Sequence, residues 1–187
     1  MDGWRYYNHA MIPTCAPHEE PDLSVIESGE IWKNERKPLL ARWTSNFDCG
    51  YETNWWYVIK DTPFNEQDIS SKERKSIRQA LNKCYVKIVD NVEYAEDLYR
   101  VYFSAFKKYK NADNKIDKQQ FLLSCQNSRD IAYWAGFDKE TNTLIGYITV
   151  LDCGDYVEIQ TAKFDPNFAK KTSIRCLVFS CFNTLSK

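Results

Sequence analysis

Four segments carry the hydrophobic pattern of β-strands. Residues 84–90 read as a strand with Tyr85, Lys87 and Val89 on one face and Val86 and Ile88 on the other. Residues 131–138, 144–152 and 156–165 are rich in β-branched and aromatic side chains. The turn "KETNT" separates the second segment from the third, and "CGD" separates the third from the fourth. The last three are therefore predicted to form consecutive antiparallel strands.

Helical periodicity fills the gaps between these segments. Residues 92–109 place one apolar stripe on a predicted helix, with Asn91 as a plausible N-cap. Residues 117–126 predict a second helix, and a third is expected from about residue 173 to 185. The predicted order from Cys84 is strand, helix, helix, three strands, helix. The stripe of the first helix consists of Tyr94, Leu98, Tyr102, Ala105 and Tyr109, widened by Val101 and Phe106.

The first part of the chain is patterned differently. Residues 1–38 are rich in proline, so regular structure there should be short. Residues 39–47 and 54–61 predict an antiparallel strand pair, since Val, Ile, Tyr and Trp are enriched and Gly50 lies in the connection. The chain is accordingly expected to have three parts: 1–38, 39–83 and 84–187.

A basic helix is predicted in front of Cys84. Ser70 and Glu73 have the spacing of a capping box. The apolar positions form one stripe, and the basic ones lie on the other faces. These charges indicate either a solvated face or a surface for a polyanion. The stripe consists of Ile77, Ala80, Leu81 and Cys84, and the basic residues are Lys72, Arg74, Lys75, Arg78 and Lys83.

Composition narrows the classes of function. The net charge of -1 gives no global electrostatic case for nucleic acid or an anionic membrane. The 7 cysteines are odd in number and form no Cys-x-x-Cys pair, so neither a zinc site nor a secreted disulfide framework is expected. With two scattered histidines, a Ser-His-Asp arrangement has no support either. No signal peptide or apolar run of membrane-spanning length is visible, so a cytoplasmic protein is expected.

The order of elements and three motifs resemble the GNAT-type acyltransferase superfamily. "LIGYITV" resembles its third strand, and "YVEIQTAKFDPNF" resembles its fourth strand with a Pro-x-aromatic before the cofactor loop. The upstream "RWTSNFDC" and "SKERKSIRQAL" are similar to a group of uncharacterised bacterial GNAT-like proteins, distantly akin to Fem-type aminoacyltransferases. The resemblance implies an α/β (α+β) fold, with a mixed, mainly antiparallel sheet flanked by helices.

The resemblance also implies acetyl-CoA or another acyl-CoA as cosubstrate, without a metal. In the family, main-chain groups of the fourth strand hold the pantetheine, and amides at a helix start hold the pyrophosphate. The first role falls on Gln160, Thr161, Ala162, Lys163 and Phe164. The second falls on Lys170, Lys171, Thr172, Ser173, Ile174 and Arg175.

This loop departs from the family pattern at the positions that approach the cofactor. Ser173 stands where glycine is expected, and Arg175 stands where glycine or alanine is expected. Glycine lets the backbone approach a pyrophosphate closely. Arginine either blocks that approach or clamps a phosphate oxygen. The basic loop therefore fits a phosphate site, but it also fits an ordinary solvated helix start.

Acyl transfer further needs a base for the amine and an acid for the leaving thiolate. Glu158 is the candidate base, on a face expected to include Tyr156 and Gln160. The alternative for Glu158 is a solvent-facing acid. Tyr147, on the neighbouring strand, is the candidate acid. The alternative for Tyr147 is a half-buried side chain that only contributes to packing.

The sequence thus predicts an N-acyltransferase that acts on an amine-bearing small molecule or cell-surface precursor. The family fold continues beyond the last helix, so the C-terminal half of the fold is expected to be missing from a truncated chain. The alternative is an inactive remnant or protein-binding module, with a homodimer formed through the open sheet edge. Binding of nucleic acid by the basic helix is the least favoured hypothesis.

Overall fold

The computed structural model describes residues 2–51, 59–107, 115–128, 130–168 and 174–185. The chain divides into two compact units, Met1–Asp61 and Thr62–Lys187. This division differs from the three parts expected from the sequence. The basic helix, which was grouped with residues 39–61, packs against elements of the second unit instead.

The first unit contains a hairpin where irregular chain was expected. Strands β1 (Trp4–Tyr7) and β2 (Ala10–Pro13) pair in antiparallel fashion, and β3 (Leu40–Ala41) joins β2 in parallel. Asn8 and His9 have φ of 50° and 63°, the left-handed backbone that a two-residue hairpin turn requires. The strand predicted for 39–47 is wrong in extent, because only Leu40–Ala41 forms a strand and it pairs with β2. Residues 54–58 of its predicted partner lie outside the described residues. Short helical segments α1 (Ser24–Glu27) and η1 (Glu30–Lys33) and the buried side chains of Trp4, Met11 and Ile31 complete the unit.

The second unit is built on a four-stranded antiparallel sheet. Its strands are β4 (Cys84–Val89), β5 (Ile131–Asp138), β6 (Leu144–Asp152) and β7 (Val157–Phe164). They lie in the order β4-β5-β6-β7. All four predicted strands are therefore confirmed.

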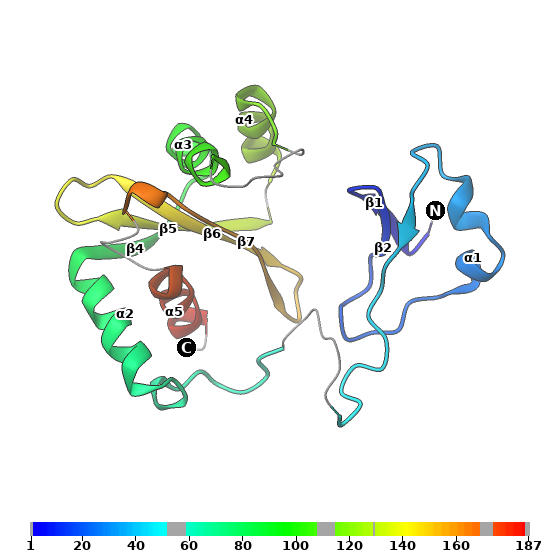
Figure 1. Ribbon diagram of the computed structural model, residues 1–187, viewed down its shortest axis with the longest axis horizontal. Helices are drawn as coiled ribbons and strands as arrows, with labels where there is room; N and C mark the ends of the chain where they lie inside the picture. The colour runs from blue at the N-terminus through cyan, green and yellow to red at the C-terminus, as the bar shows by residue number, and fades with distance from the viewer. Residues whose placement is uncertain (1, 52–58, 108–114, 129, 169–173, 186–187) are drawn as a thin grey trace. The chain divides into compact units, whose positions relative to one another are not determined.

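Helices cover both faces of this sheet (Figure 1). Helices α3 (Ala95–Phe106) and α4 (Lys118–Asn127) lie on one face, and α2 (Ser71–Lys83) and α5 (Ile174–Leu185) lie on the other. Each face has its own apolar core. The expected fold class, an α/β arrangement with a mainly antiparallel sheet flanked by helices, is confirmed. The first core includes Leu98, Val101, Phe121, Tyr133, Phe137 and Tyr147, and the second includes Ala80, Trp134, Ile148, Val150, Leu177 and Cys181.

Helix α2 begins as its sequence predicts. The Ser70 hydroxyl accepts a hydrogen bond from the Glu73 amide at 3.2 Å, and Ile77 and Ala80 of the predicted stripe are buried. Arg74 donates to the main-chain carbonyls of Glu66 and Ile69, at 3.0 and 2.7 Å. The guanidinium therefore holds the short η2 turn (Glu66–Asp68) against the first turn of α2.

The N-cap predicted for α3 is wrong. The helix begins at Ala95 after Tyr94, which forms no side-chain cap. The Asn91 amide instead donates to the carbonyls of Cys125 and Ser128, at 2.6 and 3.0 Å. Asn91 therefore satisfies acceptors at the end of α4, a long-range role that local spacing does not indicate. Of the predicted α3 stripe, Leu98, Val101, Tyr102 and Ala105 are buried, and Tyr109 lies outside the described residues.

Two glycines let α5 approach the sheet. A β-carbon at Gly146 would lie 2.7 Å from Phe164 Cδ2 and 3.1 Å from the Lys163 carbonyl oxygen. A β-carbon at Gly136 would lie 2.8 Å from Leu177 Cδ2, the flexible end of a side chain. Close packing here therefore depends on the absence of side chains.

We expect Gly146→Ala to cost about 2 kcal/mol in the free energy of unfolding, because main chain of β7 must shift. Gly136→Ala is the matched control and should cost about 1 kcal/mol or less, because the Leu177 side chain can rotate away. Urea unfolding of both variants checks this order. An equal or larger cost at Gly136 would contradict the packing described for Gly146.

Candidate active site

Strand β7 presents a free edge of main chain. It is the last strand of its sheet, and no strand among the described residues pairs with its outer side. The Asp165 amide donates to the Ile145 carbonyl at 2.8 Å, which directs residue 165 inward to β6. Main-chain groups alternate along a strand, so those of Ala162 and Phe164 point to the open edge. Both residues belong to the stretch predicted to hold pantetheine.

A β-bulge interrupts β7 at Gln160. Thr161 lies opposite Thr149, whereas Ile159 lies opposite the next residue, Val150, so Gln160 is an extra residue on β7. The bulge corrects the face expected for Glu158. Glu158 lies opposite Leu151. This register puts Glu158 on the same sheet face as Thr161, whereas a strand without the bulge would put the two residues on opposite faces.

Tyr147 lies in the core beneath α3. Its side chain is 2% exposed, and its ring centroid is 5.8 Å from that of Tyr133. Burial raises the pKa of the Tyr147 hydroxyl well above its ordinary value, and the nearby Tyr133 and Cys125 raise it further. This environment keeps the hydroxyl protonated, but it also removes the group from solvent.

The structure does not bring the two predicted catalytic side chains together. Tyr147 pairs with Lys163, whereas Glu158 pairs with Leu151, four residues further along β6. At about 3.4 Å per residue, their main chains are separated by roughly 14 Å along the strand. They share a sheet face, but a single proton-transfer step cannot join them directly.

Lys163 lies closer to Tyr147 than Glu158 does, and its side chain faces α3. Its ammonium nitrogen is 4.5 Å from the centre of the Phe106 ring, a cation–π distance. Partial burial lowers the pKa of Lys163. The side chain thus packs under α3, while its main chain pairs with Tyr147 on β6. This leaves the outward main chain of the neighbouring Ala162 and Phe164 as the accessible part of the predicted pantetheine edge.

A buried carboxylate that the sequence reasoning missed holds the end of β7. Asp165 is 4% exposed. Its oxygens accept hydrogen bonds from the Ser104 hydroxyl at 2.8 Å and the Asn167 amide at 3.0 Å, and its Oδ2 lies 3.4 Å from Arg100 Nη1. Arg100 also donates to the Leu144 carbonyl at 2.6 Å. The network fixes where β7 ends and η3 (Pro166–Phe168) begins.

The sequence around Asp165 indicates a turn, but it does not indicate the partners of the carboxylate. Asp-Pro at 165–166 indicates a turn, but its partners Arg100 and Ser104 are more than 60 residues away. Arg100 and Ser104 are four residues apart, so they share one face of α3. Only the packing of α3 on β6 and β7 shows that this face meets the end of β7.

The predicted phosphate loop is described only in part. Lys170, Lys171, Thr172 and Ser173 lie outside the described residues, and α5 begins at Ile174. Arg175, in the first turn of α5, places its guanidinium 3.4 Å from the carboxylate of Glu73 on α2. An arginine that clamps a phosphate would have to exchange this exposed ion pair for the ligand.

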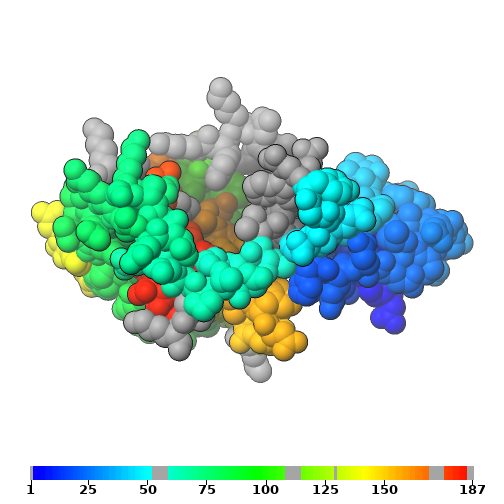
Figure 2. All heavy atoms as spheres, turned by 90° about the horizontal axis from the view of Figure 1, so that it is seen from below, coloured from blue at the N-terminus to red at the C-terminus, as the bar shows by residue number. Residues whose placement is uncertain are grey.

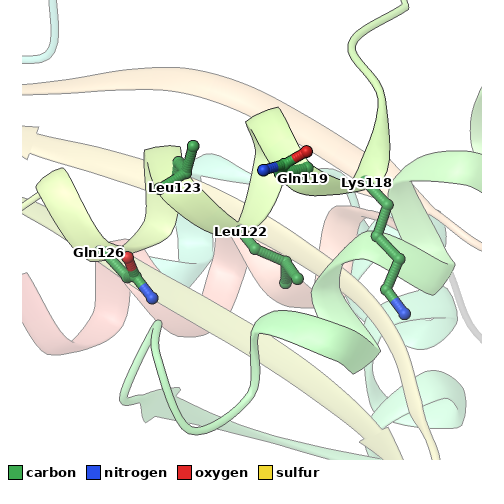
Figure 3. A pocket seen from close by; sticks show the side chains of 5 residues that line it. All are labelled: Lys118, Gln119, Leu122, Leu123 and Gln126. Atoms are coloured by element: carbon green, nitrogen blue, oxygen red, sulfur yellow. The ribbon is translucent and has the colours of Figure 1, made fainter.

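Two surface hollows lie away from β7. One is lined by residues of α4 alone, with Leu122 and Leu123 between polar neighbours (Figure 3). The other lies on the basic side of α2, and this helix forms part of the face that Figure 2 shows. Each is confined to one helix, so neither is a cleft that would enclose a substrate. The first is lined by Lys118, Gln119, Leu122, Leu123 and Gln126, and the second by Ser71, Arg74, Lys75, Arg78, Gln79 and Asn82.

In the described ranges, no three His, Cys, Asp or Glu side chains lie close enough to hold a metal ion. Within those ranges, no helix has the length and apolar character to cross a bilayer.

We predict that Asp165→Ala costs about 2 kcal/mol in the free energy of unfolding, because it removes the acceptor of the Ser104 hydroxyl, the Asn167 amide and one Arg100 nitrogen at the end of β7. Asp97→Ala is the matched control. Its carboxylate also contacts Arg100, at 3.1 Å, but its side chain is 52% exposed, so the cost should be under about 1 kcal/mol. Chemical denaturation of both variants gives the comparison, and equal costs would contradict the anchoring role of Asp165.

Comparison with known proteins finds a similarity among solved structures. No protein-family model matches the chain, and no curated protein matches it. Among solved structures, the PaiA N-acetyltransferase of Thermoplasma acidophilum, in complex with coenzyme A, is similar with 20% sequence identity and a TM-score of 0.41. The match covers 55% of this chain and 72% of that one. No conclusion about activity follows from a likeness of this degree.

Proposed function

We propose that the second unit is an N-acyltransferase lobe that takes an acyl group from acyl-CoA and transfers it to an amine. The observation that carries the proposal is the free edge of β7, with outward main-chain groups at Ala162 and Phe164. Pantetheine contains two amide groups, and such groups bind an open strand edge as an added strand would. The resemblance of the sequence to GNAT-type acyltransferases supports the same edge.

The position of α5 supports a phosphate site next to this edge. The network around Asp165 fixes the end of β7, and α5 begins nine residues later, at Ile174. In the sequence, the basic stretch 170–175 runs from this connection into the first two residues of α5. A helix start favours anions. We propose that this connection holds the pyrophosphate of acyl-CoA, with Arg175 released from Glu73 on binding.

We further propose that Glu158 removes the proton from the amine, directly or through a water molecule. Its side chain is half-buried on the α3 side of β7, two residues before the bulge. The proposed role of Tyr147 as the acid that protonates the leaving thiolate has less support, because its hydroxyl lies in the core. The acceptor class proposed is an amine-bearing small molecule or a cell-surface precursor.

An inactive binding module of the same fold is the second candidate. Two observations favour it: the separation of Tyr147 from Glu158, and the ion pair that occupies Arg175. In this case the open edge of β7 would pair with a second copy of the chain. Analytical ultracentrifugation of the full chain distinguishes the candidates, since a dimer that acetyl-CoA does not dissociate favours the module.

We expect acetyl-CoA at about 100 times its dissociation constant to raise the melting temperature by about 5 °C or more. Ala162→Pro removes an outward amide that pairs with no described strand, so the fold should tolerate it. This variant should lose most of the acetyl-CoA shift, whereas Ala162→Val keeps the amide and should retain the shift. Differential scanning fluorimetry checks both variants. A full shift in Ala162→Pro would overturn the proposed edge.

We expect Glu158→Gln to lower kcat about 100-fold or more on an amine that the wild-type chain acylates, because the base is lost. Its thermal shift with acetyl-CoA should stay, since the cosubstrate edge is intact. Asp155→Asn, in the connection before β7, is the control and should keep wild-type turnover. Release of CoA thiol, followed with a thiol reagent against an amine panel, measures both. Unchanged turnover in Glu158→Gln would remove Glu158 from the chemistry.

A further inference from the structure

Two buried thiols meet where α2 passes into β4 under α5. The sulfur atoms of Cys84 and Cys176 lie 3.5 Å apart, although the residues are 92 positions apart in the sequence. Each cysteine is 1% exposed. The Cys84 thiol also lies 3.0 Å from the Ala80 carbonyl, to which it donates. None of these contacts belongs to the proposed acyl-CoA edge.

The positions of the two residues allow a bond between them. A disulfide requires a sulfur–sulfur distance of about 2.0 Å, so the two atoms must approach by roughly 1.5 Å. Cys84 is held firmly, because it ends α2 and begins β4, opposite Asp138 of β5. Cys176 is the third residue of α5. A small movement of that helix end, or rotation of the Cys176 side chain, provides the approach.

We propose that Cys84 and Cys176 form a reversible redox site, in which a disulfide fastens the start of α5 to the α2–β4 junction. The oxidant is a small disulfide such as glutathione disulfide. One protein thiolate attacks it and releases one glutathione, and the second protein thiolate then displaces the other glutathione. Two protein thiols are thereby oxidised and one glutathione disulfide is reduced to two glutathione thiols, which take up the two protons that the protein thiols lose.

The remaining cysteines provide controls. Cys181 is buried on the same helix, five residues after Cys176, and is therefore the control for a buried thiol of α5. Cys125 lies in the other core, on the opposite face of the sheet. The more accessible thiols, which are the ones expected to form mixed or intermolecular disulfides, are Cys15, Cys49 and Cys153.

The test uses the full chain with the three accessible cysteines replaced by serine. The folded protein is incubated with glutathione disulfide, alkylated without reduction, and digested for peptide mapping. We expect a peptide pair joined through Cys84 and Cys176, and a melting temperature raised by roughly 5 °C or more because the bond closes a long loop. Dithiothreitol should reverse both changes.

Two further variants decide the assignment. Cys176→Ser should abolish the joined peptide and the thermal shift, whereas Cys181→Ser should retain both. If Cys176→Ser does not fold, peptide mapping of the parent chain still decides, because it needs no substitution at either thiol. The proposal is overturned if the parent chain gives no Cys84–Cys176 peptide after prolonged oxidation, or if the bond joins Cys181 or Cys125. None of these readouts depends on acyl-CoA, so failure of the proposed enzyme activity would leave the redox test unaffected.

Discussion

The buried carboxylate of Asp165 ties the end of β7 to α3, and the proposed site depends on that tie. Its oxygens accept from the Ser104 hydroxyl and the Asn167 amide, and they lie beside the Arg100 guanidinium. The main-chain amide of Asp165 completes the pairing of β7 with β6. The carboxylate thereby helps to fix the point where the chain leaves the sheet, and the main-chain amide keeps the last residue of the edge in register with β6. Loss of the carboxylate would loosen this end of β7, whereas the main-chain pairing with β6 would remain.

The sequence was sufficient for the regular elements of the second unit. Strand-forming side chains, turn residues and helical periodicity placed β4 to β7 and α2 to α5 correctly. Ser70 was recognisable as a cap, since its partner is only three residues away. Such features can be predicted from local sequence patterns, because the interacting groups are close in the chain.

Features that depend on distant partners were not predictable in the same way. The role of Asn91 depends on carbonyls at the end of α4, and that of Asp165 depends on a face of α3. The bulge at Gln160 reversed the expected face of Glu158, because one extra residue shifts every alternation that precedes it. The hairpin Trp4–Pro13 was hidden by its Asn-His turn, which adopts positive φ without glycine. The residues of the predicted phosphate loop before Ile174 stay a prediction.

The central claim is that acyl-CoA binds along the outer edge of β7, and amide hydrogen exchange tests it most directly. The full chain is exchanged with and without saturating acetyl-CoA, and protection is compared between β7 and β4, the strand at the opposite edge of the sheet. Our account predicts slower exchange at Ala162 and Phe164 on binding, with little change along Cys84–Val89. Unchanged exchange at Ala162 and Phe164, together with new protection elsewhere, would contradict it.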